Sequence, residues 1–539
     1  MASSAKNKQD KKQMKKRQKI NYEDQIIMWI TSLFLIYMFV VYPLLMHNRY
    51  FDITVTKYLL FKIGVICYSI LFILAVLMKY LNRLSYDNGH IRQNTDDVFA
   101  TDGRKLLAVR AVDIFMILFL ISGFMAWLMA EDKNSAFTGE TGRRCGLQFM
   151  ILSFIMYVCL AYGYQLKAFI MPVFAVISSA AYIIGILQHL GFNPFQFLDG
   201  VNKSRRDMFI STFGNINTFA SFVCIGTALC MGLFIFEGVS FLKCKSAEKI
   251  LYGITVFFSG GTFIAANSDS VYAGCGFAVV VLLFMAIAKK RLAAYLEALL
   301  LLLSGYISMA WIIRISGRGL EKISGMSRAA EHIGTLAVIV VVLVAALVLC
   351  KLAQANGKIN VPVKVQMIIA SVIVAAAVIL VIGVGVSRNW NIFMFNDHWG
   401  TNRGYVWSRL VRLYKDFPLG NKLFGFGNES VKALMVSNYY DEMMEITGVV
   451  YDNAHNEYLQ YLVTMGIFGV LSYLGAIIST IFCGVKYGRK QPVLYAFVAA
   501  ICAYCAQAAF NLNQSITTPY VFLFIGLIAG ISRECEGNR

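Results

Sequence analysis

A single histidine lies where a long polar segment meets an apolar stretch long enough to cross a membrane. The segment reads Tyr451-Asp-Asn-Ala-His-Asn-Glu-Tyr458, and His455 stands at or just before the predicted start of a helix. The positive end of a helix dipole disfavours the imidazolium ion, so a neutral imidazole is free to accept a proton near pH 7. We therefore take His455 as a candidate general base for chemistry on a lipid-linked substrate.

Arginines in the predicted outer loops could supply positive charge for a departing phosphate. Arg403 suits this role because guanidinium stays charged and grips phosphate oxygens with forked donors. Arg205 and Arg206 in one outer loop, and Arg143 and Arg144 in another, are weaker candidates for the same task. Arg403 could instead be a lipid-headgroup anchor.

The composition predicts an all-α, polytopic integral membrane protein. The chain is 58% hydrophobic and 15% charged, with a mean hydropathy of +0.63, which excludes an ordinary soluble protein. Apolar runs of about 20 residues recur along its length, and each is long enough to cross the lipid layer as a helix. We expect about 12–14 transmembrane helices, at approximately 25–46, 59–79, 109–130, 147–164, 168–190, 214–236, 250–267, 271–288, 292–312, 333–350, 364–386, 457–484, 493–510 and 518–532.

The distribution of charge predicts the topology. The net charge is +19, and a cluster of lysines precedes the first span, which the positive-inside rule assigns to the cytoplasm. Topology and attraction to the lipid bilayer explain the basic excess better than nucleic-acid binding does, so we expect no nucleic acid partner. The predicted organisation is a basic cytoplasmic tail (1–24), an N-terminal transmembrane bundle (25–386), a long extracytoplasmic loop with the catalytic motif (387–456), C-terminal transmembrane helices (457–532) and a cytoplasmic tail (533–539).

Signatures of metal and nucleotide sites are absent from the sequence. The twelve cysteines lie mostly within predicted spans and show no Cys-x-x-Cys spacing. There is no Gly-x-x-x-x-Gly-Lys-Ser/Thr phosphate loop, which argues against ATP hydrolysis. No Asp-x-Asp signature of metal-dependent glycosyl transfer stands out in an outer loop. We therefore expect neither a metal nor another cofactor.

Several short motifs of the long outer loop together resemble one family. An arginine is followed four residues later by tryptophan, then by a Pro-hydrophobic-Gly turn, a His-Asn pair and a Gly-x-x-Gly. Here these are Arg403 with Trp407, Pro418 to Gly420, His455-Asn456, and Gly466 with Gly469. In these residues the chain resembles the O-antigen ligase and O-antigen polymerase superfamily of bacterial membrane glycosyltransferases.

Two upstream segments extend the resemblance, and a third departs from it. Asn215 and Asn217 match the family's Gly-Asn-x-Asn element at the start of a span, and Gly139 to Gly146 resembles its first outer loop. At Asn267-Ser-Asp-Ser270, however, Asp269 stands where the family commonly has an arginine that grips the lipid pyrophosphate. Either one of the weaker arginine candidates takes over that role, or the donor carries a different phosphate group.

The resemblance implies a polytopic glycosyltransferase of the bacterial cytoplasmic membrane. Its donor would be a glycan linked to polyprenyl phosphate or pyrophosphate, and its acceptor a hydroxyl of a surface glycan or other molecule at the outer face. With His455 as base and no covalent nucleophile, the transfer would invert the anomeric carbon. Ligase and polymerase differ only in acceptor, and the sequence does not separate them.

Further residues of the motifs are candidates for substrate binding. Trp407 and Tyr451 could stack on sugar rings or belong to an interfacial aromatic belt. Asn215 and Asn217 could cap a helix or contact substrate. Including the arginines, the set is Arg205, Arg206, Arg143, Arg144, Asn215, Asn217, Trp407, Asn456 and Tyr451.

Two other classes of protein fit parts of the pattern. A flippase or exporter of lipid-linked oligosaccharides would also have twelve to fourteen spans and basic cavities. A transporter should carry charges within its spans, however, whereas polar residues here crowd the outer loops. A catalytically inactive receptor on the same fold is the third reading, because Asp269 replaces the expected arginine.

Overall fold

The computed structural model describes residues 22–87, 109–163, 170–236, 245–318, 324–356, 361–390 and 393–537. Most of the predicted tail at 1–24, and the last two residues of the predicted tail at 533–539, lie outside these ranges. The described residues are mostly helical, and their only strands are one antiparallel pair of two residues each, β1 (Phe209–Ile210) and β2 (Gly214–Asn215). The all-α prediction is therefore confirmed.

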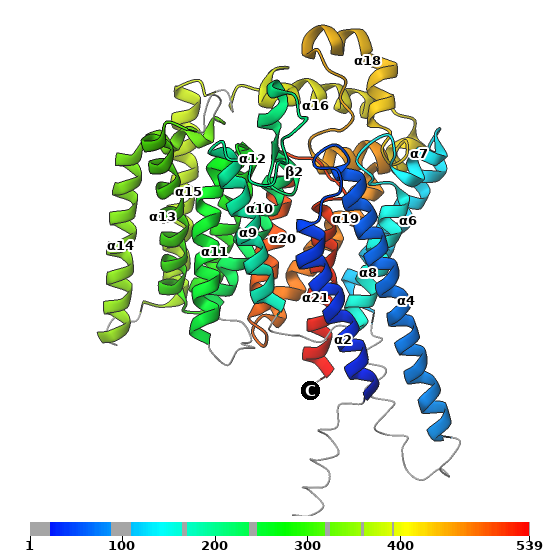
Figure 1. The fold of residues 1–539 in the computed structure, drawn as a ribbon, viewed down its shortest axis with the longest axis horizontal. Coiled ribbons are helices and arrows are strands. Elements are labelled where there is room, and N and C mark those ends of the chain that lie inside the picture. Colours follow the sequence, from blue (N-terminus) through cyan, green and yellow to red (C-terminus); the bar gives the residue numbers. More distant parts are fainter. Residues whose placement is uncertain are drawn as a thin grey trace, which may run out of the picture.

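Figure 1 shows the order of the helices along the chain. In order they are α2 (Tyr22–Ile36), η1 (Tyr37–Val41), α3 (Tyr42–Leu44), α4 (Ile53–Asp87), α6 (Ala111–Met129), α7 (Lys133–Thr138), α8 (Leu147–Gly163), α9 (Ile170–His189), η2 (Lys203–Met208), α10 (Ile216–Phe236), α11 (Lys245–Ala265), α12 (Asp269–Ala288), α13 (Leu292–Ser316), η3 (Met326–Glu331), α14 (Ile333–Asn356), α15 (Val363–Ser387), α16 (Trp399–Asp416), α17 (Leu419–Phe424), α18 (Val431–Thr447), α19 (Glu457–Tyr487), α20 (Val493–Ala508) and α21 (Thr518–Gly537).

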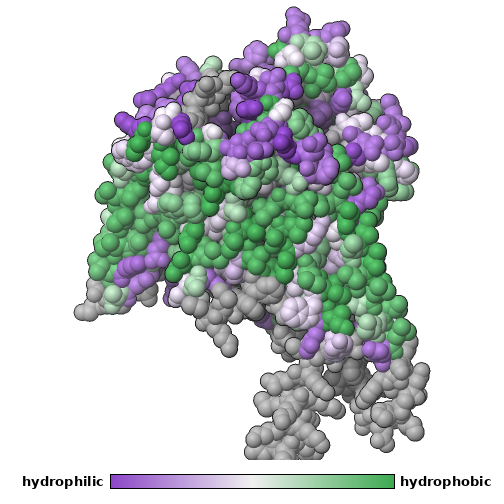
Figure 2. All heavy atoms as spheres, viewed as in Figure 1, coloured by the Kyte–Doolittle hydropathy of each residue, from purple (hydrophilic) through white to green (hydrophobic). Residues whose placement is uncertain are grey.

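Eleven helices of the described residues are long and apolar enough to cross a membrane. They comprise α2 with its continuation to Leu44, α4, α6, α9, α10, α12, α13, α14, α15, α19 and α21. Two shorter apolar helices, α8 and α20, pack among them. Figure 2 shows the resulting apolar band with a hydrophilic cap above it, as expected of a polytopic membrane protein.

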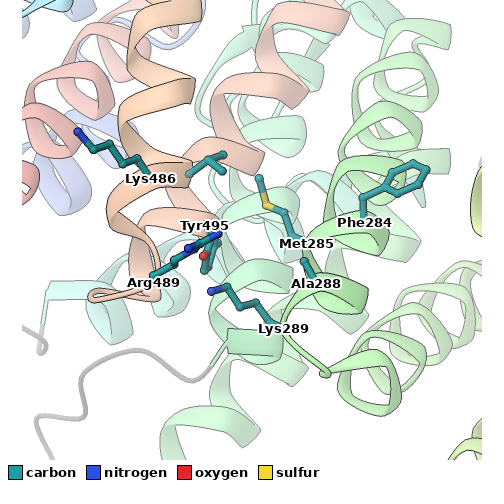
Figure 3. Close-up of a pocket in the computed structure, with 8 residues that line it drawn as sticks. Phe284, Met285, Ala288, Lys289, Lys486, Arg489 and Tyr495 are labelled. Carbon is teal, nitrogen blue, oxygen red and sulfur yellow. The ribbon is translucent and has the colours of Figure 1, made fainter. Parts of the chain in front are cut away.

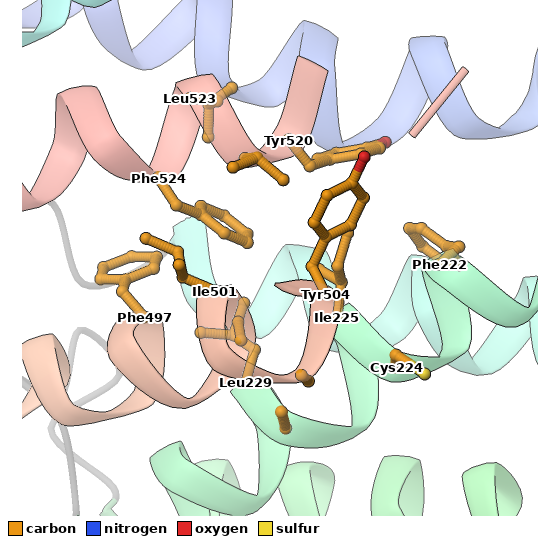
Figure 4. Close-up of a cluster of buried hydrophobic side chains, with 14 of the residues drawn as sticks. Phe222, Cys224, Ile225, Leu229, Phe497, Ile501, Tyr504, Tyr520, Leu523 and Phe524 are labelled. Atoms are coloured by element: carbon orange, nitrogen blue, oxygen red, sulfur yellow. The ribbon is translucent and has the colours of Figure 1, made fainter. Parts of the chain in front are cut away.

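The core of the bundle is built around α10, every residue of which from Thr218 onward is buried. This helix packs against α20, α12 and α11, while α21 packs against α8. Figure 4 shows the aromatic and aliphatic side chains of α10, α20 and α21 that interlock here, among them Phe222, Phe497, Tyr504 and Phe524. At the opposite extreme, α14 and α15 have almost no fully buried residues and form one edge of the bundle (Figure 1).

The predicted long loop is itself helical and forms the hydrophilic cap with α16, α17 and α18 (Figure 1). Its helices share a small apolar core that includes Tyr405, Leu410 and Met435. The guanidinium of Arg409 joins them, because Nη1 contacts Asp397 Oδ1 at 2.7 Å and Nη2 contacts Glu442 Oε1 at 2.6 Å. Such forked pairing holds α16, α18 and the segment before α16 in a fixed arrangement.

Candidate active site

The backbone around His455 is fixed by three side chains. Asn453 Oδ1 accepts a hydrogen bond from the His455 backbone N–H at 2.9 Å. Trp407 Nε1 donates to the carbonyl oxygen of Ala454 at 2.9 Å, and Gln460 Oε1 accepts from the Ala454 N–H at 2.9 Å. His455 has a backbone φ of 48°, which lies in the left-handed region that residues other than glycine rarely adopt. Strain of this kind persists only where the surroundings over-determine the backbone.

The imidazole of His455, by contrast, has a ring nitrogen that is not used in the described part of the structure. Its Nδ1 is buried and makes no hydrogen bond with any described residue. The ring meets Tyr451 edge-on, with centroids 6.0 Å apart. Burial, followed by the charges of Arg403 and Arg143, lowers the pKa of His455 to about 3, and Asp452 opposes that shift. The free protein therefore holds a neutral imidazole.

Arg403 begins the regular part of α16. The preceding residues Gly400, Thr401 and Asn402 have φ values of 58°, 62° and 66°, so the chain turns sharply before the helix continues. Arg403 Nη1 donates to the Gly400 carbonyl at 3.1 Å, while its Nε is buried with no partner among the described residues. Burial lowers the pKa of Arg403, and the negative charge of Asp269 opposes this effect. Asp269 therefore lies close enough to Arg403 for their charges to interact.

Arg143 reaches the same region from the loop between α7 and α8. Its Nη2 forms an ion pair with Asp452 at 3.2 Å, three residues before the histidine. Its Nε is buried and has no partner within the described ranges. Its charge is one of the two that lower the pKa of His455, so both arginines lie near the imidazole. Arg144 instead pairs with Glu140 at 3.1 Å.

A buried carboxyl group, Glu429, supports the Arg143 loop. The backbone N–H of Cys145 donates to Glu429 Oε1 at 2.9 Å, and the other carboxyl oxygen is buried with no described partner. Burial raises the pKa of Glu429 to about 7. A methyl group on Gly142 would meet Glu429 Oε2 at 2.0 Å, so the loop fits the carboxyl closely only with glycine at this position.

The connection between α20 and α21 forms a polar floor beneath these loops. Its residues 511–517 are all buried. Asn513 Oδ1 accepts from Asn453 Nδ2 at 3.3 Å, and Asn511 Nδ2 donates to the Asn217 carbonyl at 2.8 Å. The Ser515 N–H donates to the Arg143 carbonyl at 3.4 Å. The floor therefore joins the histidine loop, the Arg143 loop and the start of α10.

The predicted asparagine candidates are engaged in local structure. Asn456 caps α19, because its Oδ1 accepts from the Leu459 N–H at 3.0 Å. Asn215 Oδ1 accepts from the Asn217 N–H at 2.8 Å. Asn217 Oδ1 in turn accepts from the Ser268 hydroxyl at 2.9 Å, next to Asp269.

The remaining candidates divide into residues near His455 and residues apart from it. Trp407 and Tyr451 contact the histidine segment directly, and the Tyr451 hydroxyl also donates to the Thr401 carbonyl at 3.4 Å. Arg205 and Arg206 are exposed in η2, and among the described residues no hydrogen bond or ion pair links them to His455 or Arg403.

The glycines of the motif connect the cap to α19. Gly466 interrupts α19 with a φ of 66°, and a methyl group there would lie 2.3 Å from the Leu423 carbonyl. Just above this break, the Phe426 and Gly427 N–H groups donate to the Val463 and Thr464 carbonyls at 3.2 and 3.0 Å. The helix opens at Gly466 so that the segment after α17 can bind its backbone.

Sequence reasoning missed several supporting residues, namely Asp452, Asn453, Gln460, Glu429 and Asn513. Asp452 and Asn453 were adjacent to the motif, and their polarity beside a span was the available signal. The run Asn511-Leu-Asn-Gln-Ser515 between two apolar spans was another.

No group of three or more metal-ligating side chains is found among the described residues. The arrangement combines a neutral proton acceptor with two guanidinium groups that have unused donors.

One family model matches part of the chain. Residues 331–474 match the family model described as O-Antigen ligase. The matched segment runs from the end of η3 into the middle of α19, and it contains Arg403, Trp407, His455 and Gly466. No curated protein sequence matches the chain. By this match, residues 331–474 of the chain are similar to the O-antigen ligase family.

Proposed function

We propose that the chain is a glycosyltransferase that moves a glycan from a polyprenyl phosphate or pyrophosphate carrier to an acceptor hydroxyl. The family match supports ligase- or polymerase-type chemistry on glycans. One contrast carries the proposal. Three side chains hydrogen-bond the backbone of Ala454 and His455, yet the imidazole Nδ1 of His455 has no hydrogen-bond partner among the described residues. A rigidly held but unengaged base is what a reaction with an external hydroxyl requires.

The reaction is a single displacement. The acceptor hydroxyl gives its proton to a ring nitrogen of His455 while its oxygen forms a bond to the anomeric carbon. The bond from that carbon to the carrier phosphate breaks, and the phosphate oxygen keeps the electron pair. Attack from the side opposite the leaving group inverts the anomeric configuration. Arg403 and Arg143 stabilise the charge that develops on the phosphate.

Binding of the donor adjusts the base. A pKa of about 3 makes His455 a weak proton acceptor in the free protein. The negative phosphate of a donor bound between Arg403 and Arg143 offsets the two charges that contribute to this low pKa. The imidazole therefore becomes more basic only when a donor is present.

The surroundings of the site define the remaining features of the proposal. The two guanidinium groups supply the positive charge that a divalent cation would otherwise provide, so transfer proceeds without metal. The donor enters from lipid and the acceptor from water, at the outer face of the bacterial cytoplasmic membrane, with both termini in the cytoplasm. The activity of the purified protein in the presence of a chelator tests whether transfer is independent of metal. Loss of turnover that magnesium restores would contradict metal-independent transfer.

Gene deletion followed by complementation tests the function. Loss of the protein should change the surface glycan and cause polyprenyl-linked intermediates to accumulate. The His455→Ala variant should fail to restore the glycan, while His47→Ala, at an exposed histidine paired with Asp52, should restore it. Normal glycan with His455→Ala at wild-type expression would show that the assigned base is wrong.

Purified protein in detergent separates transfer from transport. Micelles have no two sides between which a lipid could be transported. A flippase makes no glycosidic bond between lipid-linked donor and acceptor, so it should yield no new product. A transferase still forms one. The same products distinguish the two kinds of transferase, because a polymerase yields a ladder of lengths and a ligase a single addition.

A further inference from the structure

A group of basic and apolar side chains gathers at the opposite face of the bundle from His455. A cavity of about 700 Å³ opens between the ends of α12 and α19 and the start of α20. Both α12 and α19 begin near the candidate active site, at Asp269 and Glu457, and run through the bundle to this cavity. A helix of 20 residues is about 30 Å long, so the two sites are separated by roughly the thickness of the lipid layer.

The lining of the cavity combines positive charge with apolar surface. Its residues are Phe284, Met285, Ala288, Lys289, Val485, Lys486, Arg489 and Tyr495. Figure 3 shows Lys289 and Arg489 approaching Tyr495 from two different helix ends, with Phe284 and Met285 on one side. Lys289 Nζ lies 5.2 Å from the centre of the Tyr495 ring. Lys486 contributes its aliphatic stem, because its Nζ lies over the Tyr487 ring at 4.9 Å.

The cations of the cavity have no acidic partner in the described part of the chain. Ion pairs neutralise lysines elsewhere on the bundle, as Glu297 does for Lys249 and Lys351. Lys289 and Arg489 make no such pair with a described residue. Two unneutralised cations that converge on a cavity attract an anion with several oxygen acceptors.

We propose that this cavity binds the phosphate of an anionic membrane phospholipid. Lys289 and Arg489 contact the phosphate oxygens, and the acyl chain lies along Phe284 and Met285. A lipid fits better than a free anion because the cavity pairs its cations with apolar walls. It also lies at the ends of membrane-spanning helices, at the level where headgroups gather.

Lipid binding to purified protein tests the proposal. Delipidated protein in neutral detergent is titrated with fluorescent phosphatidylglycerol and, separately, with phosphatidylcholine. The protein should retain phosphatidylglycerol selectively, and Lys289→Gln/Arg489→Gln should weaken its binding about tenfold or more, because each basic residue near a surface contributes about 1 kcal/mol. Lys289→Arg keeps the charge and should preserve binding.

Two controls separate a built cavity from general attraction to a basic surface. Lys364→Gln removes one exposed charge at the start of α15, outside the cavity, and should leave binding unchanged, whereas Lys289→Gln should weaken it. Ala288→Leu fills the cavity without altering its charge and should also weaken binding. Equal effects of Lys289→Gln and Lys364→Gln, or no effect of Ala288→Leu, would overturn the proposal.

Competition with inorganic phosphate identifies the source of the anion. Millimolar inorganic phosphate should not displace phosphatidylglycerol, since it cannot occupy the apolar walls. Displacement by phosphate with equal weak binding of both phospholipids would reject a lipid site. Circular dichroism and elution volume confirm that each variant is folded, so loss of binding is read only from intact protein.

Discussion

The indole nitrogen of Trp407 donates a hydrogen bond of 2.9 Å to the carbonyl of Ala454, the residue directly before His455. The arginine-to-tryptophan spacing of the motif therefore has a physical basis. One turn of α16 separates Arg403 from Trp407, so the helix fixes the candidate phosphate-binding group and the peptide of the candidate base relative to each other.

Replacement of Trp407 by phenylalanine should slow transfer without unfolding the protein. Phenylalanine keeps the aromatic surface against Phe510 and Trp399 but leaves the Ala454 carbonyl without its donor. We expect kcat to fall about tenfold, the equivalent of one lost hydrogen bond. Trp127→Phe is the matched control, because Trp127 Nε1 also donates to a backbone carbonyl, that of Lys133. Equal rates for both variants would contradict the role of Trp407.

The pH dependence of transfer should differ between free and donor-bound protein. The pKa of His455 is about 3 in the free protein, whereas an ordinary histidine has a pKa near 6.5. As the pH is lowered, kcat/KM should therefore not decrease at about pH 6.5. A bound phosphate offsets the nearby arginine charges, so the acid limb of kcat should lie at higher pH than that of kcat/KM. Coincident acid limbs would contradict the proposed coupling between donor and base.

The same low pKa makes a prediction about stability. Between about pH 3 and 6.5 the unfolded chain binds a proton at His455 that the folded chain does not. The free energy of unfolding should therefore decrease as pH falls through this range. In His455→Gln this contribution is absent, so the variant should lose less stability than the wild type between pH 6.5 and 4.5. Parallel denaturant titrations at each pH measure the difference.

The Asp269→Asn substitution should strengthen donor binding. The negative charge of Asp269 acts on Arg403 and also repels a phosphate held there. Asparagine keeps an oxygen that can accept from the Met326 N–H, a bond of 2.9 Å in the present structure, so the local fold is retained. We expect the KM for the lipid-linked donor to fall by about three- to tenfold, on the scale of one screened charge pair. A higher KM would mean that Asp269 mainly positions the arginine.

The Gly466→Ala substitution should destabilise the protein. A methyl group there would clash with the Leu423 carbonyl on a backbone already at positive φ. The expected loss is about 1–3 kcal/mol in the free energy of unfolding. Gly383→Ala, in α15 with open space around it, is the control and should be neutral or slightly stabilising. Thermal unfolding in detergent compares the two.

The membrane-spanning helices could be predicted because their signal is local. The expected spans 147–164 and 364–386 agree with α8 and α15 to within a residue or two, since hydropathy alone defines such stretches. The break in α19 could not be predicted, because a lone glycine in an apolar run is compatible with a continuous helix. It depends on Leu423, which is more than forty residues away.

The supporting contacts of the site were beyond reach of the sequence for the same reason. Asn453 meets Asn513, and Glu429 meets Cys145, across separations that only the folded bundle closes. Asp269 was read as a departure from the family pattern, but its electrostatic effect on Arg403 depends on how α12 and α16 are arranged. Short motifs identify residue types, whereas their partners are determined by three-dimensional packing.

The interruption at Gly466 has a mechanical consequence. The part of α19 beyond it is about 32 Å long, at 1.5 Å per residue, and can cross the bilayer unaided. The part before it is tied to the cap through Phe426 and Gly427. When the bilayer thins or thickens, the lower part can tilt while the upper part stays in register with the cap. We therefore expect the position of His455 relative to Arg403 to stay the same when the acyl-chain length of the lipid changes. The turnover rate in reconstituted vesicles should then not depend on acyl-chain length.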